Sequence, residues 1–382
     1  VMPDLLREIS GGDLGNAAIW GGILASIFAI MQFLFGPTLG SLSDRYGRRP
    51  VLLVSLIVMA IDFIVMGLAH SIWLLITTRI IGGIAAATQS TAAAFISDIS
   101  TARTRSANFG ILGASFGVGF VLGPLLGGLL GEFGFRIPFF AAAALATFNF
   151  ILGYYVLPET VTNRIRRPFD VKRSNPLGAL KQINKISGMI RFLIVFFLFK
   201  FAFFVYPAVW AYYAKIQFNW DPGMVGVSLA SFGISIAIVE GILIRYLLPR
   251  FGERRTVVIG FLFNFAIFII LGFITSGFWA LLLTPISALG SIVIPAIRGI
   301  ISNKAKANQQ GEVHGIIAST ESLAVIFAPL VLTYIFYVST RSDGAFYLPG
   351  MPFFFAAVII SAALTVFITR AKGSIGSSKN TT

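Results

Sequence analysis

Long apolar runs follow one another along the whole chain, and short polar segments separate them. The runs from Ala17 to Leu39 and from Val51 to His70 are each long enough to cross a bilayer, which takes about 20 residues. Between them lies Gly40–Pro50, a short segment with three arginines. Because short loops rich in Lys and Arg stay inside, we interpret it as a tight loop at the cytoplasmic face. Further runs predict membrane-spanning helices over residues 72–97, 108–131, 137–157, 191–214, 223–248, 256–275, 277–301, 312–338 and 348–369.

The composition also indicates an integral membrane protein. Hydrophobic residues make up 57% of the chain and charged residues only 12%, against about 25% charged residues in soluble domains. The net charge is +14, but most Lys and Arg fall in alternate loops and the C-terminal segment, which is the positive-inside pattern. We therefore expect a lipid bilayer and no nucleic acid as partner. With no cysteine and only two histidines, we expect no metal site and no cofactor.

The second half of the chain repeats the first at a fixed offset. Adding 205 to the residue number carries Asp44–Arg49 onto Pro249–Arg254 and Gly123-Pro124 onto Ala328-Pro329. The same offset carries the run over 191–214 back to about −14 to 9, so we expect most of a first helix to be missing before Val1. The repeat predicts an N-terminal transmembrane half over 1–158, a basic cytoplasmic linker over 159–190, a C-terminal half over 191–370 and a cytoplasmic tail over 371–382.

The charged segment Gly40–Pro50 resembles the signature loop between helices 2 and 3 of the major facilitator superfamily. Val51–Pro124 is similar to the tetracycline-efflux branch of its drug/proton antiporters, and weaker similarity continues to about Tyr337. The resemblance implies an all-α integral membrane fold of twelve helices in two six-helix halves, with the substrate path between the halves. In this fold the signature loop acts as a gate, whose residues here are Gly40, Asp44, Arg45, Gly47, Arg48, Arg49 and, on helix 4, Asp98.

The resemblance implies how this gate works. Asp44 would face the N-terminal end of helix 11 near Gly311, where the helix dipole is positive. Asp98 would pair with Arg48 or Arg49. Such contacts exist only when the cytoplasmic side is closed, so we expect them to favour the outward-facing state.

Helix 5 is rich in glycine at spacings that let helices approach closely. The pairs at 113/117, 119/123 and 123/127 are small-xxx-small spacings. The resemblance implies the antiporter motif at the interface between the halves, and generic helix packing is the alternative. The residues concerned are Gly113, Gly117, Gly119, Gly123, Pro124 and Gly127.

An ionisable side chain near the bilayer centre costs about 2.5–3.5 kcal/mol on insertion scales, so each one calls for a reason. A proton-coupled transporter needs an acid that can bind and release a proton, and Asp62 and Glu321 are the best placed. Arg79 resembles the helix 4 arginine that antiporters of this superfamily place beside the proton path. We assign proton coupling to Asp62, Arg79 and Glu321. Alternatively, each could belong to a neutralising pair that only holds helices together.

The substrate cavity departs from the tetracycline branch. Lys200 and Arg298 stand where that branch has glutamines, Asn264 replaces an acid, and Glu240 and Glu321 are acids where it is uncharged. Tetracycline itself is therefore in doubt. Cations at these positions suit an anionic or zwitterionic molecule, unless the two glutamates neutralise them. We assign to the cavity Gln32, Gln89, Lys200, Glu240, Asn264 and Arg298.

The pattern as a whole predicts a secondary active transporter. We expect a proton-coupled efflux antiporter of a small organic molecule, acting as a monomer in the inner membrane of a bacterium with its C-terminus in the cytoplasm. Two alternatives stay open: a proton symporter or facilitator for a metabolite, and a transport-inactive membrane sensor. We do not expect an enzyme, because the sequence shows no nucleophile-base constellation, metal cluster or phosphate-binding loop.

Overall fold

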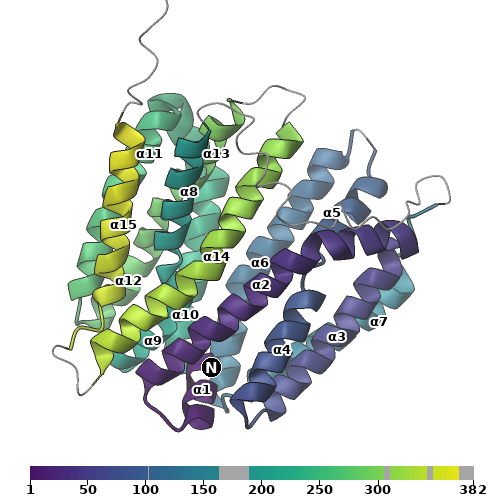
Figure 1. The fold of residues 1–382 in the computed structure, drawn as a ribbon, viewed down its shortest axis with the longest axis horizontal. Helices are drawn as coiled ribbons and strands as arrows, with labels where there is room; N and C mark the ends of the chain where they lie inside the picture. Colours follow the sequence, from purple (N-terminus) through teal and green to yellow (C-terminus); the bar gives the residue numbers. More distant parts are fainter. Residues whose placement is uncertain (102, 163–188, 305–309, 342–346, 370–382) are drawn as a thin grey trace, which may run out of the picture.

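The computed structural model describes residues 1–101, 103–162, 189–304, 310–341 and 347–369. Most of the predicted linker over 159–190 and all of the predicted tail over 371–382 lie outside these residues. The described part is all-helical and forms two bundles side by side (Figure 1). The first bundle comprises α1 (Met2–Ser10), α2 (Leu14–Tyr46), α3 (Arg48–Leu68), α4 (Ile72–Ala85), α5 (Gln89–Asp98), α6 (Arg105–Glu132) and α7 (Ile137–Val156).

The second bundle begins with α8 (Ile190–Phe203) and α9 (Val205–Phe218), which follow each other across Phe204. It continues with α10 (Pro222–Ile238), the π-helical η2 (Val239–Leu243), α11 (Ile244–Phe273), α12 (Gly277–Ser287), the 3₁₀ segment η3 (Ala288–Ile292), α13 (Val293–Ser302), α14 (Gln310–Thr340) and α15 (Met351–Ile368).

Ten helical segments among the described residues are long and apolar enough to cross a membrane. One of them, Pro222–Phe273, has 52 residues, and at 1.5 Å per residue it is more than twice as long as the hydrocarbon core of about 30 Å. It therefore holds two crossings, and it bends at Gly252, whose φ of 72° is not helical. Eleven crossings result, and the all-α membrane fold that the sequence predicted is confirmed.

The predicted loop Gly40–Pro50 is mostly helix. α2 runs to Tyr46, α3 starts at Arg48, and only Gly47 leaves the helical conformation, with φ 114°. Residues with a side chain rarely adopt this positive φ, so a glycine allows the turn to be this short. The apolar pattern gave boundaries inside the true ones because it does not register polar helix ends that project beyond the hydrocarbon.

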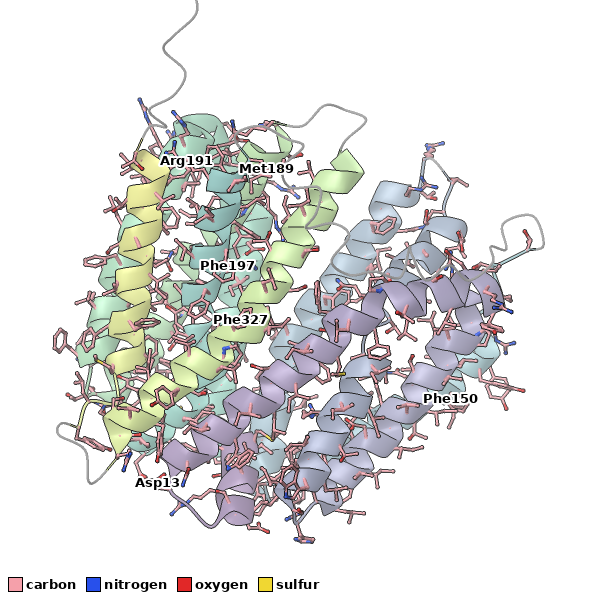
Figure 2. The ribbon with its side chains drawn as sticks, in the orientation of Figure 1. Asp13, Phe150, Met189, Arg191, Phe197 and Phe327 are labelled. Carbon is pink, nitrogen blue, oxygen red and sulfur yellow. The ribbon has the colours of Figure 1, made fainter. Side chains whose placement is uncertain are left out.

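The two ends of the molecule differ in charge. We call the end with Arg45, Arg48, Arg49, Arg103 and Arg191 the arginine-rich face, and the end with Asp13 and Asp221 the opposite face; Arg191 and Asp13 mark them in Figure 2. Long apolar side chains project outward from both bundles between these faces (Figure 2), as expected of surfaces that contact lipid.

The bundles touch near the opposite face. There α2 crosses α14, and Ser26 Oγ donates a hydrogen bond of 2.7 Å to Ile326 O. α6 crosses α10 at Gly128 and Gly226, where the backbones meet. From these crossings α2 and α14 diverge toward the arginine-rich face (Figure 1). The structure is thus closed at the opposite face and spread apart at the arginine-rich face.

Candidate transport site

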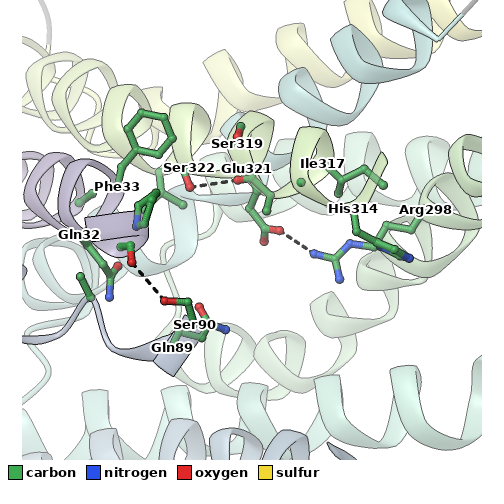
Figure 3. A pocket seen from close by; sticks show the side chains of 17 residues that line it. Gln32, Phe33, Gln89, Ser90, Arg298, His314, Ile317, Ser319, Glu321 and Ser322 are labelled. Carbon is green, nitrogen blue, oxygen red and sulfur yellow. Dashed lines mark hydrogen bonds and ion pairs between the residues drawn. The ribbon is translucent and has the colours of Figure 1, made fainter. Parts of the chain in front are cut away.

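A cavity of about 900 Å³ lies between the two bundles, on the arginine-rich side of the α2–α14 crossing. α2 and α5 line it from the first bundle, and α13 and α14 line it from the second. Its polar side chains include Gln32, Gln89, Ser90, Arg298 and Glu321, and Figure 3 shows them around the same space. Its size falls in the range of about 300–1,000 Å³ typical of small-molecule sites.

Helices are interrupted in both bundles, and the break of the first bundle reaches the cavity at Ala87, whereas that of the second is buried in protein. In the first bundle α4 ends at Ala85 and α5 begins at Gln89, and Gln32 Nε2 donates a hydrogen bond of 3.3 Å to the freed carbonyl of Ala86. In the second bundle the 3₁₀ segment η3 separates α12 from α13, and Asn264 Nδ2 donates one of 3.0 Å to Gly290 O. Side-chain amides thus satisfy carbonyls that would otherwise be unpaired inside a membrane.

The two breaks occupy corresponding positions of the repeat, because the offset of 205 carries Ala86 onto Ser291. Paired breaks in the two halves of a transporter point to the binding site, since non-helical backbone is tolerated at membrane depth where it lines a cavity or is buried in protein. The breaks therefore support the cavity as the place where a substrate would bind.

Three of the six residues assigned to the cavity line it: Gln32, Gln89 and Arg298. Asn264 does not, because its side chain is fully buried between α11 and η3 and bonds to Gly260 O and Gly290 O. The sequence located it on a core helix without showing which way it points. Lys200 and Glu240 do not line the cavity either, but both interact with Glu321, which does.

The charged residues of the second bundle form one cluster. Glu321 on α14 uses its two carboxylate oxygens separately: Oε1 lies 2.5 Å from Lys200 Nζ on α8, and Oε2 lies 2.6 Å from Arg298 on α13. Glu240 on η2 interacts electrostatically with all three. Figure 3 shows the pair of Glu321 and Arg298 at the cavity wall. Two acids thus balance two bases, which is the internal neutralisation that the sequence left open.

The first bundle holds a separate buried pair. Arg79 NH2 on α4 lies 3.1 Å from Asp62 Oδ2 on α3, and the Asp62 side chain is only 5% exposed. Arg79 also contacts Met66 Sδ and lies over the ring of Phe28, 5.2 Å from its centroid. Among the described residues, Asp62 Oδ1 has no hydrogen-bond partner. Two of the three residues assigned to proton coupling are thus together, and Glu321 belongs to the other cluster.

The gating residues form a compact network on the arginine-rich face. Arg48 donates a hydrogen bond of 2.6 Å to Ser43 Oγ, pairs with Asp44, and lies 3.3 Å from Asp98 Oδ2. Arg48 is thus one of the two partners expected for Asp98, but the pair forms here while the arginine-rich face is spread apart, so the expectation that it exists only when that face is closed is wrong. Asp44 pairs here with Arg48 of α3, and the side chains of residues 305–312 lie outside the described ones, so the predicted latch stays a prediction.

Glu159 is a member of this network that the sequence did not single out. Its carboxylate accepts hydrogen bonds from the backbone N–H groups of Arg48, at 3.0 Å, and Arg49, at 3.3 Å. An acid at a helix N-terminus satisfies donors that have no partner within the helix. An acid just after an apolar run was its only signal, and 111 residues separate it from Arg48.

The predicted close packing of α6 is mostly wrong for this conformation. A Cβ added at Gly113, Gly117, Gly119, Gly123 or Gly127 would meet nothing within 4 Å. Close contact occurs one residue further along, at Gly128, which faces Gly226 of α10. The physical reason is the orientation of α6: Phe120, Val121 and Pro124 also contact α10, at Gly233 and Gly226, so the glycines of the motif lie on a face of α6 that is turned away from this neighbour.

Comparison with known proteins identifies the fold family. A family model described as Major Facilitator Superfamily matches residues 5–329 and, in a second match, residues 192–380. The chain belongs to the major facilitator superfamily. This major facilitator protein is therefore a membrane transporter for small molecules and not an enzyme, and the family resemblance of the sequence is confirmed.

Relatives are resistance proteins of bacteria. The tetracycline resistance protein of class C from Escherichia coli is 36% identical over 342 residues, which cover 90% of this chain and 86% of the relative. Multidrug resistance protein 2 of Bacillus subtilis is 28% identical over 95% of this chain and 88% of its own. The crystal structure of the human organic anion transporter MFSD10 matches with a TM-score of 0.66, covering 96% of this chain and 88% of that one. At 23% identity this last likeness concerns the fold alone.

Proposed function

We propose that the chain is a proton-coupled efflux antiporter for a small organic molecule. The observation that carries the proposal is the cavity of about 900 Å³ between the bundles, which reaches the helix break of the first half at Ala87 and is closed toward the opposite face. A cavity of this kind serves alternating access, in which the two bundles rock about a central site. The names of the bacterial relatives, resistance to tetracycline and to multiple drugs, favour export over uptake.

The sidedness follows from the charges. Because Lys and Arg stay on the cytoplasmic side, the arginine-rich face is cytoplasmic and the structure is inward-facing. The bacterial relatives favour the inner membrane as location, with the C-terminus in the cytoplasm. The N-terminal half over 1–158 and the C-terminal half over 191–370 act as the two rocking units, and helices of one chain line the cavity from both sides, so a monomer suffices.

The two charged centres have different tasks in this proposal. Asp62 and Arg79 are buried inside the first bundle, away from the substrate cavity. There Asp62 carries the proton, and the fixed charge of Arg79 helps to release it. The cluster of Lys200, Arg298 and Glu321 borders the cavity and selects the substrate. Separate sites allow proton and substrate to be coupled through the conformation and not through direct competition.

The test uses the full chain in proteoliposomes with a pH-sensitive dye inside. A panel of anionic, zwitterionic and cationic drug-like molecules is added, and proton flux and substrate flux are recorded together. An antiporter moves protons against the direction of the substrate. Protons that travel with the substrate would instead indicate the symporter, and substrate flux without protons would indicate the facilitator.

Asp62→Asn is expected to abolish accumulation driven by the pH gradient, because the neutral amide cannot bind and release a proton. Each charge that crosses the membrane is worth about 2.3 kcal/mol per 100 mV, and this drive is lost in the variant. The matched control is Asp13→Asn, which changes an acid to an amide at the N-cap of α2, where Asn caps as well as Asp. Full gradient-driven accumulation by Asp62→Asn would place the proton site elsewhere.

A further inference from the structure

The Glu321 carboxylate is held in the manner of a bound ligand. Its two oxygens are bound by two cations from two other helices, Lys200 Nζ at 2.5 Å and Arg298 NH2 at 2.6 Å. Charge-assisted contacts of this length are the strong ones in proteins. The geometry is the one that a carboxylate of a small molecule would need at the same two cations.

The two cations keep a common position through a buried aromatic ring. Lys200 Nζ lies 5.9 Å and Arg298 Cζ lies 5.8 Å from the ring centroid of Phe196, whose side chain is fully buried. Cations within about 6 Å of an aromatic face are attracted to it. The Phe196 ring on α8 therefore helps to hold Lys200 and Arg298 in place, independently of Glu321 on α14.

Exposure distinguishes the members of the cluster. The Arg298 side chain is 44% exposed and borders the cavity, whereas the Lys200 side chain is 18% exposed and lies deeper. Apolar residues such as Phe33 and Ile317 line the same cavity. A molecule with an apolar body and one carboxylate would reach Arg298 from the cavity.

We propose that Lys200 and Arg298 form the binding site for a carboxylate group of the transported molecule, and that Glu321 is the internal carboxylate that occupies this site until the substrate replaces it. The substrate carboxylate takes the position of the Glu321 carboxylate, and the displaced side chain turns into the water of the cavity. Glu240 balances only one of the two cations, so Glu321 keeps the site from carrying a net positive charge inside the membrane between transport cycles, which would be costly. The transport role of the site rests on the proposed function, but the binding itself does not.

The test is a binding measurement on the purified full chain in detergent, by titration calorimetry. The probes are benzoate, benzamide and benzylammonium, which share one ring and differ in charge. Wild-type protein is expected to bind benzoate at least about tenfold more tightly than the other two. Glu321→Gln removes the internal competitor while keeping the shape, so benzoate is expected to bind about tenfold more tightly still.

Three further variants keep the test decisive. Arg298→Gln is expected to weaken benzoate by about tenfold. Its matched control Arg245→Gln alters an exposed arginine outside the cavity and is expected to bind as wild type does. Glu321→Asp keeps the negative charge and is expected to stay near wild type, which also serves if Glu321→Gln does not fold.

The inference would be overturned by benzamide that binds as tightly as benzoate, or by benzoate affinity that does not rise in Glu321→Gln. No binding of benzoate by wild type or either Glu321 variant would also overturn it. Because no proton gradient is involved, the outcome is independent of the antiport test. If benzoate binding responds as expected but the protein moves no protons in vesicles, the carboxylate site is supported and the antiporter proposal is contradicted.

Discussion

Gly128 on α6 and Gly226 on α10 meet backbone to backbone where the two bundles close at the opposite face. A Cβ at Gly128 would lie 2.6 Å from Pro222 O and 2.8 Å from Gly226 Cα. A Cβ at Gly226 would lie 2.6 Å from Pro124 O. Backbone atoms cannot yield as a flexible side chain does, so the contact requires glycine on both helices.

The first prediction is that Gly128→Ala and Gly226→Ala disfavour the conformation seen here. Overpacking costs about 1–3 kcal/mol, which shifts a two-state population by about 5- to 150-fold. The chain has no native cysteine, so a single cysteine at Ala318, which lines the cavity, reports access from the arginine-rich face. Its alkylation by a charged maleimide is expected to slow in both variants.

Gly110→Ala is the matched control for this experiment, because a Cβ there meets nothing within 4 Å. In this variant the cysteine at Ala318 should be alkylated at the wild-type rate or faster. Equal rates in all four proteins would show that the glycine contact does not hold this conformation.

The second prediction concerns Arg48, which alone joins Ser43, Asp44 and Asp98. Arg48→Gln leaves two partly exposed carboxylates without their cation, and we expect a loss of about 1–3 kcal/mol in stability. Thermal unfolding in detergent measures it. Arg45→Gln is the control, since among the described residues the one contact of the Arg45 side chain is a cation–π contact with the exposed ring of Tyr46. An unchanged unfolding temperature for Arg48→Gln would contradict the network.

The third prediction concerns Gly82, which lies beside the proton pair. A Cβ at Gly82 would be 2.6 Å from Asp62 Oδ2, the oxygen that faces Arg79. Gly82→Ala must therefore push Asp62 away from Arg79, and we expect the ratio of protons to substrate moved to fall while substrate binding persists. A merely structural effect would lower binding and both fluxes together. Flux ratios and binding, measured on the same preparation, separate the two outcomes.

The sequence predicts the fold well because bilayer crossing depends on local hydropathy, which each apolar run carries by itself. It does not predict the break at Ala86–Thr88, which contains no proline. The break at η3 has a weak local signal, since Pro295 cannot donate a hydrogen bond to Ser291 O four residues earlier. In both breaks the amide that stabilises the carbonyl comes from another helix. Gln32 is 54 residues from Ala86, and Asn264 is 26 residues from Gly290. Such breaks are decided by tertiary contacts that no single window of sequence contains.

The candidate site, too, was predictable from the sequence only in part. Charges inside apolar runs identified Asp62, Arg79, Lys200, Arg298 and Glu321 as residues that need partners. Which acid pairs with which base depends on how the helices are placed, and the pairing of Glu321 with two bases appears only in three dimensions. The assignment of Asn264 to the cavity was wrong for a related reason, because a polar side chain inside a membrane can face either a cavity or an interruption in a neighbouring helix.

The last prediction concerns Asp4 on α1 and Lys215 on α9, which join the two bundles at the opposite face. Lys215 Nζ lies 2.9 Å from Asp4 Oδ1, and both side chains are largely buried, with 12% and 25% exposed. This pair must separate when the opposite face opens, so it favours the closed arrangement seen here.

Asp4→Asn and Lys215→Gln are each expected to ease opening of the opposite face, and alkylation of the cysteine at Ala318 should slow by a few-fold. Removing one member of a partly buried pair leaves the other charge uncompensated, and the penalty falls on the closed state. The exchange variant that carries Asp4→Lys together with Lys215→Asp restores the attraction with the charges reversed. It should recover the wild-type alkylation rate, whereas a general loss of packing would make the double variant slower than either single one. A double variant that is slower still, or single variants that react as wild type does, would show that this pair does not hold the bundles together.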